Sequence, residues 1–101
     1  MNHVDNVIQA RLSAQQAFLG EVPPALRAAV LSVSSEEIEL RCYVDGPIHP
    51  DDAESVSLVE THVMADFEPD QSVSARCIRL DAPEPVADDG VWVYSRREST
   101  G

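Results

Sequence analysis

The sequence predicts an α+β fold, a two-layer sandwich in which two helices cover one face of a four-stranded, mainly antiparallel sheet. Residues 37–44 alternate apolar and polar side chains, which is typical of a half-buried strand. Residues 51–67 repeat apolar side chains at helical spacing, and the flanking segments complete the order helix, strand, strand, helix, strand, strand. Such elements share one core when the helices cover a single sheet face. The 101 residues fit one domain, residues 1–101.

The first half of the chain predicts a helix followed by a hairpin. The helix is expected from about Asp5 to Leu19, with Gly20 as its stop. Its apolar stripe comprises Val4, Ile8, Leu12 and Leu19, with Val7 and Phe18 beside them. Residues 26–34 predict a strand partly covered on both faces. Because residues 34–36 form only a short connection, we expect this strand to turn straight back into the strand 37–44 as a hairpin.

The second half predicts a helix and a second hairpin. Asp51 and Asp52 open the helix, and Pro69 follows its end, since the residue before a proline avoids the helical region. Residues 72–80 and 91–97 predict the last two strands, joined by an acidic, proline-rich loop. Trp92 and Tyr94 are expected on one face of the fourth strand. The expected core comprises Ile38, Leu40, Val44, Val59, Val63, Phe67, Ile78 and Leu80.

The charge balance indicates the kind of partner. The chain has 18 acidic and 7 basic residues, all of the latter arginine, and a net charge of -11. No lysine or arginine lies between Arg41 and Arg76, whereas eight acids do. Such a field repels nucleic acids and anionic membranes and attracts a basic partner. The alternative is that the acidity only keeps a small protein soluble and monomeric.

No catalytic or cofactor motif accompanies these elements. The four glycines are scattered, which argues against a phosphate-binding loop. Asp51, Asp52 and Glu54 crowd one helical turn, but acids at this position are typical of helix capping. A zinc site needs cysteines and histidines paired at short spacing, whereas the candidates lie far apart in the sequence; they are Cys42, His49, His62 and Cys77. We therefore predict a protein without enzymatic activity, metal or cofactor. An enzyme that unites a cysteine, a histidine and an acid in one cleft is an alternative.

The sequence also predicts a cytoplasmic location. The N-terminus lacks the positive and apolar regions of a secretory signal, and no run of 18 apolar residues is present. In a reducing compartment, Cys42 and Cys77 are expected as buried thiols, although a disulfide between neighbouring strands stays open.

Several runs of the sequence together resemble one family of small acidic bacterial proteins. The runs are Phe18–Arg27, Tyr43–Gly46, Glu60–Phe67, Ile78–Pro85 and Trp92–Arg97. The family is similar to the immunity proteins of contact-dependent growth inhibition and of related polymorphic toxin systems. The resemblance covers the chain from about Leu12 to Glu98, and its motifs are structural. It therefore implies an immunity protein but carries over no toxin-contacting residue.

Charge and resemblance lead to one functional hypothesis. A toxin that cuts RNA or DNA presents a basic groove, which an acidic protein can occupy as a charge mimic. We predict a monomer that binds the C-terminal domain of its cognate toxin one to one and binds neither nucleic acid nor membrane. A small acidic adaptor that binds another basic protein is the main alternative.

The predicted contacts come from two acidic segments, residues 45–70 and 81–89. The acidic candidates are Asp51, Asp52, Glu54, Glu60, Glu84, Asp88 and Asp89. Tyr43, Trp92 and Tyr94 are candidate aromatic anchors if the uncovered sheet face joins the interface. Packing at the sheet edge is the alternative for Trp92.

Overall fold

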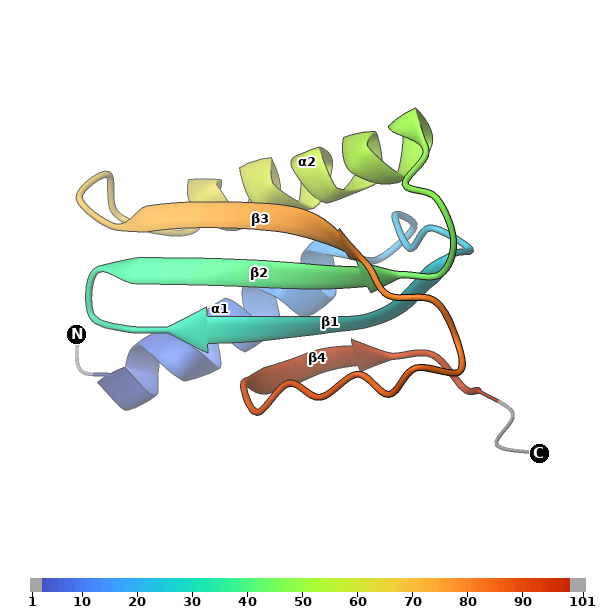
Figure 1. The fold of residues 1–101 in the computed structure, drawn as a ribbon. Helices are drawn as coiled ribbons and strands as arrows, with labels where there is room; N and C mark the ends of the chain where they lie inside the picture. The colour runs from blue at the N-terminus through green and yellow to red at the C-terminus, as the bar shows by residue number, and fades with distance from the viewer. Residues whose placement is uncertain (1–2, 99–101) are drawn as a thin grey trace.

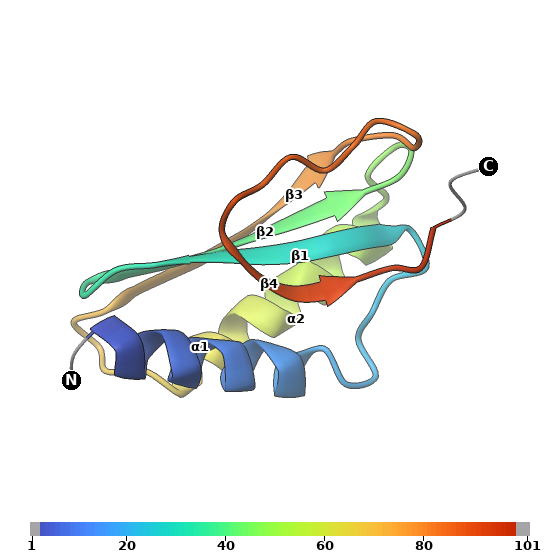
Figure 2. The ribbon, with the colours of Figure 1, turned by 90° about the horizontal axis from the view of Figure 1, so that it is seen from below.

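The computed structural model describes residues 3–98 and confirms the predicted order of helices and strands (Figure 1). The elements are α1 (His3–Ala17), β1 (Leu26–Val33), β2 (Glu37–Val44), α2 (Pro50–Ala65), β3 (Ser72–Arg79) and β4 (Val91–Ser95). Both helices lie on the same face of the sheet, as the two-layer prediction required (Figure 2).

The four-stranded sheet is mixed, so the prediction of a mainly antiparallel sheet needs correction. Its strand order is β3-β2-β1-β4. β1 is antiparallel to β2 and to β4, whereas β2 is parallel to β3. The parallel pair arises because α2 carries the chain back across the sheet before β3 begins, as a crossover helix does. The expected hairpin of the last two strands is therefore wrong: β3 and β4 form opposite edges of the sheet.

The core lies between the sheet and the two helices. Ile38, Leu40 and Val44 of β2 face it together with Val59 and Val63 of α2, as predicted. The predicted inward face of β3 is wrong, because the alternate set of side chains faces the core. Its side chains in contact with the core are Val73, Ala75 and Cys77, whereas Ile78 and Leu80 are half-buried outside that cluster. Phe67, also predicted as buried, packs half-buried against the core.

β1 is covered on both faces, as expected. Its residues from Leu26 to Leu31 are all buried. The long connection from β3 to β4 crosses the sheet face opposite the helices (Figure 2). Gly90 ends this connection so close to β1 that an added Cβ would lie 2.6 Å from the carbonyl oxygen of Leu31. A side chain at this position would therefore push the connection away from the sheet.

Helix α1 is rotated relative to the sequence prediction. The predicted apolar stripe includes Ile8, Leu12 and Leu19, but these side chains are 54%, 56% and 79% exposed. The buried face of the helix carries smaller side chains, including Ala10, Ala14 and Ala17. Small residues allow a close approach, and Ser13 Oγ–H donates a hydrogen bond of 2.6 Å to Asp66 just after α2. The side chain of Val4, also in the predicted stripe, lies outside the described part.

Because of a bulge, and contrary to the sequence prediction, Tyr94 does not share a face with Trp92. The register of β4 against β1 shifts between Ala29 and Val30, so that Tyr94 lies opposite Ala29 and Trp92 opposite Val30. An extra residue in one strand moves the following side chains to the other face. Tyr94 therefore packs against the core, where its ring stacks on Phe18 at a centroid distance of 6.3 Å.

Candidate functional site

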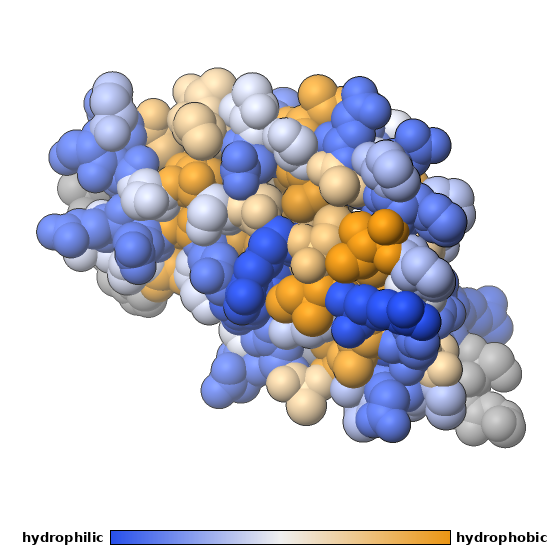
Figure 3. Space-filling model, turned by 45° about the horizontal axis from the view of Figure 1, so that its top comes forward, coloured by the Kyte–Doolittle hydropathy of each residue, from blue (hydrophilic) through white to orange (hydrophobic). Residues whose placement is uncertain are grey.

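The charged side chains of this protein fall into two groups, those paired within the fold and those that are not. In Figure 3, hydrophilic side chains surround smaller apolar areas on the side of α2 and β3. Within residues 3–98, five of the seven arginines form ion pairs, and these pairs use five acids. Since the chain has 18 acidic residues, most of them have no arginine partner in the described structure. Five acids thus have their charge offset by an arginine within the described residues.

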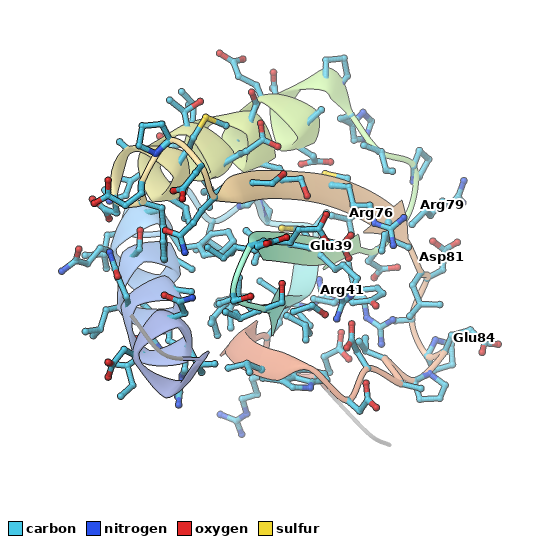
Figure 4. The ribbon with its side chains drawn as sticks, turned by 90° about the vertical axis from the view of Figure 1, so that its left-hand side faces the viewer. Glu39, Arg41, Arg76, Arg79, Asp81 and Glu84 are labelled. Carbon is cyan, nitrogen blue, oxygen red and sulfur yellow. The ribbon has the colours of Figure 1, made fainter. Side chains whose placement is uncertain are left out.

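The first paired group holds the β3–β4 connection on the open face of the sheet, and we call it the clamp (Arg41, Tyr43 and Asp88). Arg41 donates from Nε and Nη2 to the two carboxylate oxygens of Asp88, at 2.8 and 2.9 Å. Tyr43 donates its hydroxyl proton to Asp88 Oδ2 at 2.7 Å. The Asp88 side chain is only 5% exposed. Figure 4 shows Arg41 and Glu39 on the side of the sheet away from the helices.

The clamp shifts the protonation of its members. The hydrogen bonds from Arg41 hold the pKa of Asp88 well below its usual range, and the same bonds raise the pKa of Arg41. Burial, followed by the bond to Asp88, raises the pKa of Tyr43. Asp88 is therefore a charged, structural acid, and its charge is already neutralised by Arg41.

The second paired group lies where β2 and β3 end, and we call it the arginine end (Arg27, Arg79, Arg96, Asp45, Asp81 and Glu98). Arg27, with a side chain only 3% exposed, donates to both carboxylate oxygens of Glu98 at 2.7 and 2.9 Å. Its third contact, at 2.7 Å, is the carbonyl oxygen of Leu80. Arg96 reaches Glu98 and Asp45, at 2.9 and 3.4 Å.

Hydrogen bonds also perturb the acids of the arginine end. Those from Arg27 lower the pKa of Glu98 to about 2. Arg79 and the backbone N–H of Gly46 lower the pKa of Asp81. Both acids are therefore charged and bonded to an arginine. Glu98 ties the last described residues to β1, and Asp81 ties the start of the β3–β4 connection to the turn after β2.

The structure places several predicted contact residues in internal roles. Asp52 is 6% exposed and accepts the backbone N–H of His49 at the start of α2, so it caps the helix. Glu60 accepts the backbone N–H of Ala75 in β3 at 2.7 Å. Asp88 and Tyr43 belong to the clamp, and Tyr94 stacks on Phe18. Trp92 is 38% exposed, and its indole N–H donates to the carbonyl oxygen of Asp88 at 2.8 Å.

The four remaining candidates are exposed but lie on two sides of the molecule. Asp51 and Glu54 lie in the first turns of α2, in the helix layer. Glu84 and Asp89 lie in the β3–β4 connection, on the other side of the sheet (Figures 2 and 4). None of the four forms an ion pair within residues 3–98. The fold therefore does not unite the exposed candidates in one surface.

Sequence reasoning missed a group of acids that the fold does bring together, which we call the hairpin end (Glu36, Glu37, Glu68 and Asp70). Glu36 and Glu37 lie at the β1–β2 turn, and Glu68 and Asp70 lie in the α2–β3 turn. The backbone joins the two turns: Ser72 N–H donates to the carbonyl oxygen of Glu36 at 2.8 Å, and β2 and β3 start side by side (Figure 1). All four side chains are exposed, and no ion pair reaches them within the described residues.

The signal for the hairpin end was present in the sequence, since both turns were predicted. What was missing was the parallel pairing of β2 and β3, because only this pairing starts both strands at the same end of the sheet. Like charges this close raise the local negative potential, which a basic partner would relieve.

The two cysteines lie in register on neighbouring strands but are poorly suited to nucleophilic chemistry. Cys42 of β2 is paired with Cys77 of β3, and both are free thiols. Burial raises the pKa of Cys42 to about 12 and also raises the pKa of Cys77. Because the thiolate is the reactive form, these cysteines are held in the unreactive state. Among the described side chains, no three of the types that bind metals converge on one site.

Neither described helix combines the length and the apolar character needed to cross a membrane. In the comparison with protein families, the model of the family described as MafI2 immunity protein matches residues 7–98. Comparison with curated proteins found no match. The family description agrees with the resemblance to an immunity protein of a toxin system, and it does not name contact-dependent growth inhibition.

Proposed function

Since the chain belongs to the MafI2 immunity protein family and so neutralises a toxin, we propose that it does this by binding a basic surface of the toxin through the acids of its hairpin end. The observation that supports this surface is the grouping of four exposed acids in two adjoining turns without an arginine partner within residues 3–98. Elsewhere in the fold, the arginine end and the clamp neutralise their acids internally.

The proposed toxin is an enzyme that acts on RNA or DNA. Its substrate groove must be basic, because it has to attract a phosphate backbone. An acidic protein that covers such a groove excludes the substrate without performing chemistry of its own. The toxin and its inhibitor would meet in the cytoplasm, where the nucleic acids are. With a net charge of -11, the inhibitor itself repels nucleic acid.

We propose a complex of one immunity protein with the C-terminal domain of one toxin. Two copies of the chain repel each other through their net charge, which favours a free monomer. The exposed acids outside the hairpin end, namely Asp51, Glu54, Glu84 and Asp89, would contribute to the field that steers the toxin toward the complex.

The proposal is tested with the toxin domain that we expect to be encoded immediately upstream of the gene for this chain. The domain is purified with and without an inactivating substitution, and cleavage of labelled RNA and DNA is followed as the immunity protein is added. We expect cleavage by the active domain to stop at one equivalent, and calorimetry with the inactive domain to give a stoichiometry of one.

Two results would contradict this function. The first is an active domain that keeps its full rate in the presence of excess immunity protein. The second is tight binding to a domain that cleaves neither RNA nor DNA, which would keep the role in immunity but reject the nuclease.

A further inference from the structure

The outer edge of β3 is available for pairing with another strand. β3 is the last strand on its side of the sheet, and its inner edge is bonded to β2. The N–H groups of Ser72 and Leu80, at its two ends, donate to the carbonyl oxygens of Glu36 and Val44. Backbone groups alternate in direction along a strand, so the N–H groups of Val73, Ala75, Cys77 and Arg79 point outward.

Of these four outward N–H groups, only that of Ala75 has a partner within the described residues. Glu60 of α2 reaches over the edge and accepts the N–H of Ala75 at 2.7 Å. The N–H groups of Val73, Cys77 and Arg79 donate no hydrogen bond in this part of the chain. A row of free N–H groups along an edge is the pattern with which another extended chain pairs.

The edge also borders a groove that can receive side chains. The groove, of about 240 Å³, runs between α2 and β3; its walls include Val56 and Ser57 on one side and Ala75 and Cys77 on the other, and its charged lining residues are Glu60 and Arg76. Figure 3 views this side of the molecule, where apolar side chains reach the surface among hydrophilic ones. An extended segment on the β3 edge would place every second side chain against the groove.

Charge decides between the possible occupants. A second copy of the chain is disfavoured, because two chains of net charge -11 repel each other and their Glu60 side chains would approach at the centre of a paired edge. A basic segment is instead attracted to the acids near this edge. It would enter past Glu68 and Asp70, which directly precede β3, and then meet Glu60.

We propose that the outer edge of β3 binds an extended basic segment of the toxin, which adds a fifth strand to the sheet. This inference rests on the proposed function and extends the contact from the hairpin end along β3. A backbone carbonyl of the segment replaces Glu60 as the acceptor of the Ala75 N–H. An arginine or lysine of the segment then pairs with the released carboxylate of Glu60. In the free protein, Glu60 occupies the centre of the edge and hinders unspecific strand pairing.

Hydrogen exchange at single amides tests the site of binding. The probe is the inactive toxin domain described above, at saturating concentration, with the full chain labelled for NMR. The amides of Val73, Cys77 and Arg79 should exchange rapidly in the free protein and at least about tenfold more slowly in the complex. Those of Ser74 and Arg76 point toward β2 and should be protected in both states.

Two variants at one position separate the backbone from the side chain. Arg79→Pro removes an outward N–H, whereas Arg79→Ala removes the same exposed side chain and keeps the N–H. We expect Arg79→Pro to bind the inactive domain at least about tenfold more weakly than Arg79→Ala, with melting temperatures that differ by a few degrees at most. Should Arg79→Pro fail to fold, the exchange measurement on the unchanged chain still decides.

The outcomes separate this inference from the function on which it rests. If the unchanged chain binds the toxin domain and the three outward amides exchange as before, the edge is not the contact and the inference is overturned, while the function stands. If the chain binds no toxin domain, both fail. Protection of these amides in a dimer of the free chain would make a second copy the occupant and would also overturn the inference.

Discussion

The two ends of the sheet carry acidic side chains that differ in their partners. At the arginine end, Asp45, Asp81 and Glu98 each contact an arginine. At the hairpin end, four exposed acids lie in two adjoining turns, and no described ion pair reaches them. Acids of the same types therefore differ in their surroundings: those at the arginine end are paired within the fold, and those at the hairpin end are the ones that we propose to contact the toxin.

This difference explains how a chain of net charge -11 can fold and still present charge to a partner. Repulsion among acids opposes a compact state. At the arginine end and in the clamp, the acids are offset by arginines and help to fix the chain. At the hairpin end they project into water, where solvent and salt screen their repulsion. Removal of a paired acid should therefore affect stability, and removal of an unpaired one should affect binding.

The largest expected effect on stability comes from the clamp. Asp88→Ala leaves the largely buried Arg41 with Glu39 as its one carboxylate partner among the described residues and takes away the acceptor of the Tyr43 hydroxyl, so it should lower the free energy of unfolding by about 2–4 kcal/mol. Its neighbour Asp89 is exposed and forms no ion pair within residues 3–98, so Asp89→Ala should change this free energy by no more than about 0.5 kcal/mol. Urea unfolding of both variants measures the difference. Equal losses would show that pairing does not distinguish these acids.

The second prediction concerns acid pH, where the sign follows from the lowered pKa values. Glu98, with a pKa of about 2 in the folded protein against an ordinary 4.5, stabilises the fold above pH 4.5, and this contribution is lost as the pH falls toward 2. Asp88 and Asp81 act in the same direction. Urea unfolding at a series of pH values should show this fall. Glu98→Gln should lower stability at pH 7 and flatten the fall below pH 4.5; an unchanged pH profile would contradict the role of Glu98.

The smallest effect on stability is expected at the hairpin end. The double variant Glu36→Gln, Glu68→Gln removes two negative charges without loss of an ion pair in the described structure. Its free energy of unfolding should stay within about 0.5 kcal/mol of the unchanged chain, or rise slightly as repulsion falls. Thermal unfolding at low and high salt measures this. A loss of several kcal/mol would mean that these acids support the fold.

The sequence allowed the element order and the helix-covered sheet to be predicted, because the period of the apolar side chains in residues 37–44 and 51–67 is a local signal. Strand pairing is not local. A helix precedes β3, and the residues of β3 carry no local signal for pairing with β2 rather than with β4. The error in strand pairing also hid the proximity of the turns that carry Glu36 and Glu68.

Two further errors have specific physical causes. In α1, apolar periodicity favoured Ile8 and Leu12 as the inner face, but close packing selected the smaller Ala10 and Ala14 instead. In β4, the bulge moved Tyr94 to the helix side. For the candidate site, the acidity and the absence of a motif could be read from sequence. The internal roles of Asp52, Glu60 and Asp88 could not, since each depends on a contact made in three dimensions.

The central claim, that the hairpin end is the contact surface for the toxin, is tested most directly by two double charge reversals with the same change in net charge. Glu36→Arg with Asp70→Arg alters the hairpin end, and Asp51→Arg with Glu54→Arg alters two exposed acids at the start of α2. Binding of each variant to the inactive toxin domain is measured at several salt concentrations. We expect the hairpin-end variant to bind at least about thirtyfold more weakly, with a reduced salt dependence, and the α2 variant to lose less than about fivefold through slower association. Equal losses in both variants, or an unchanged affinity of the hairpin-end variant, would contradict the claim.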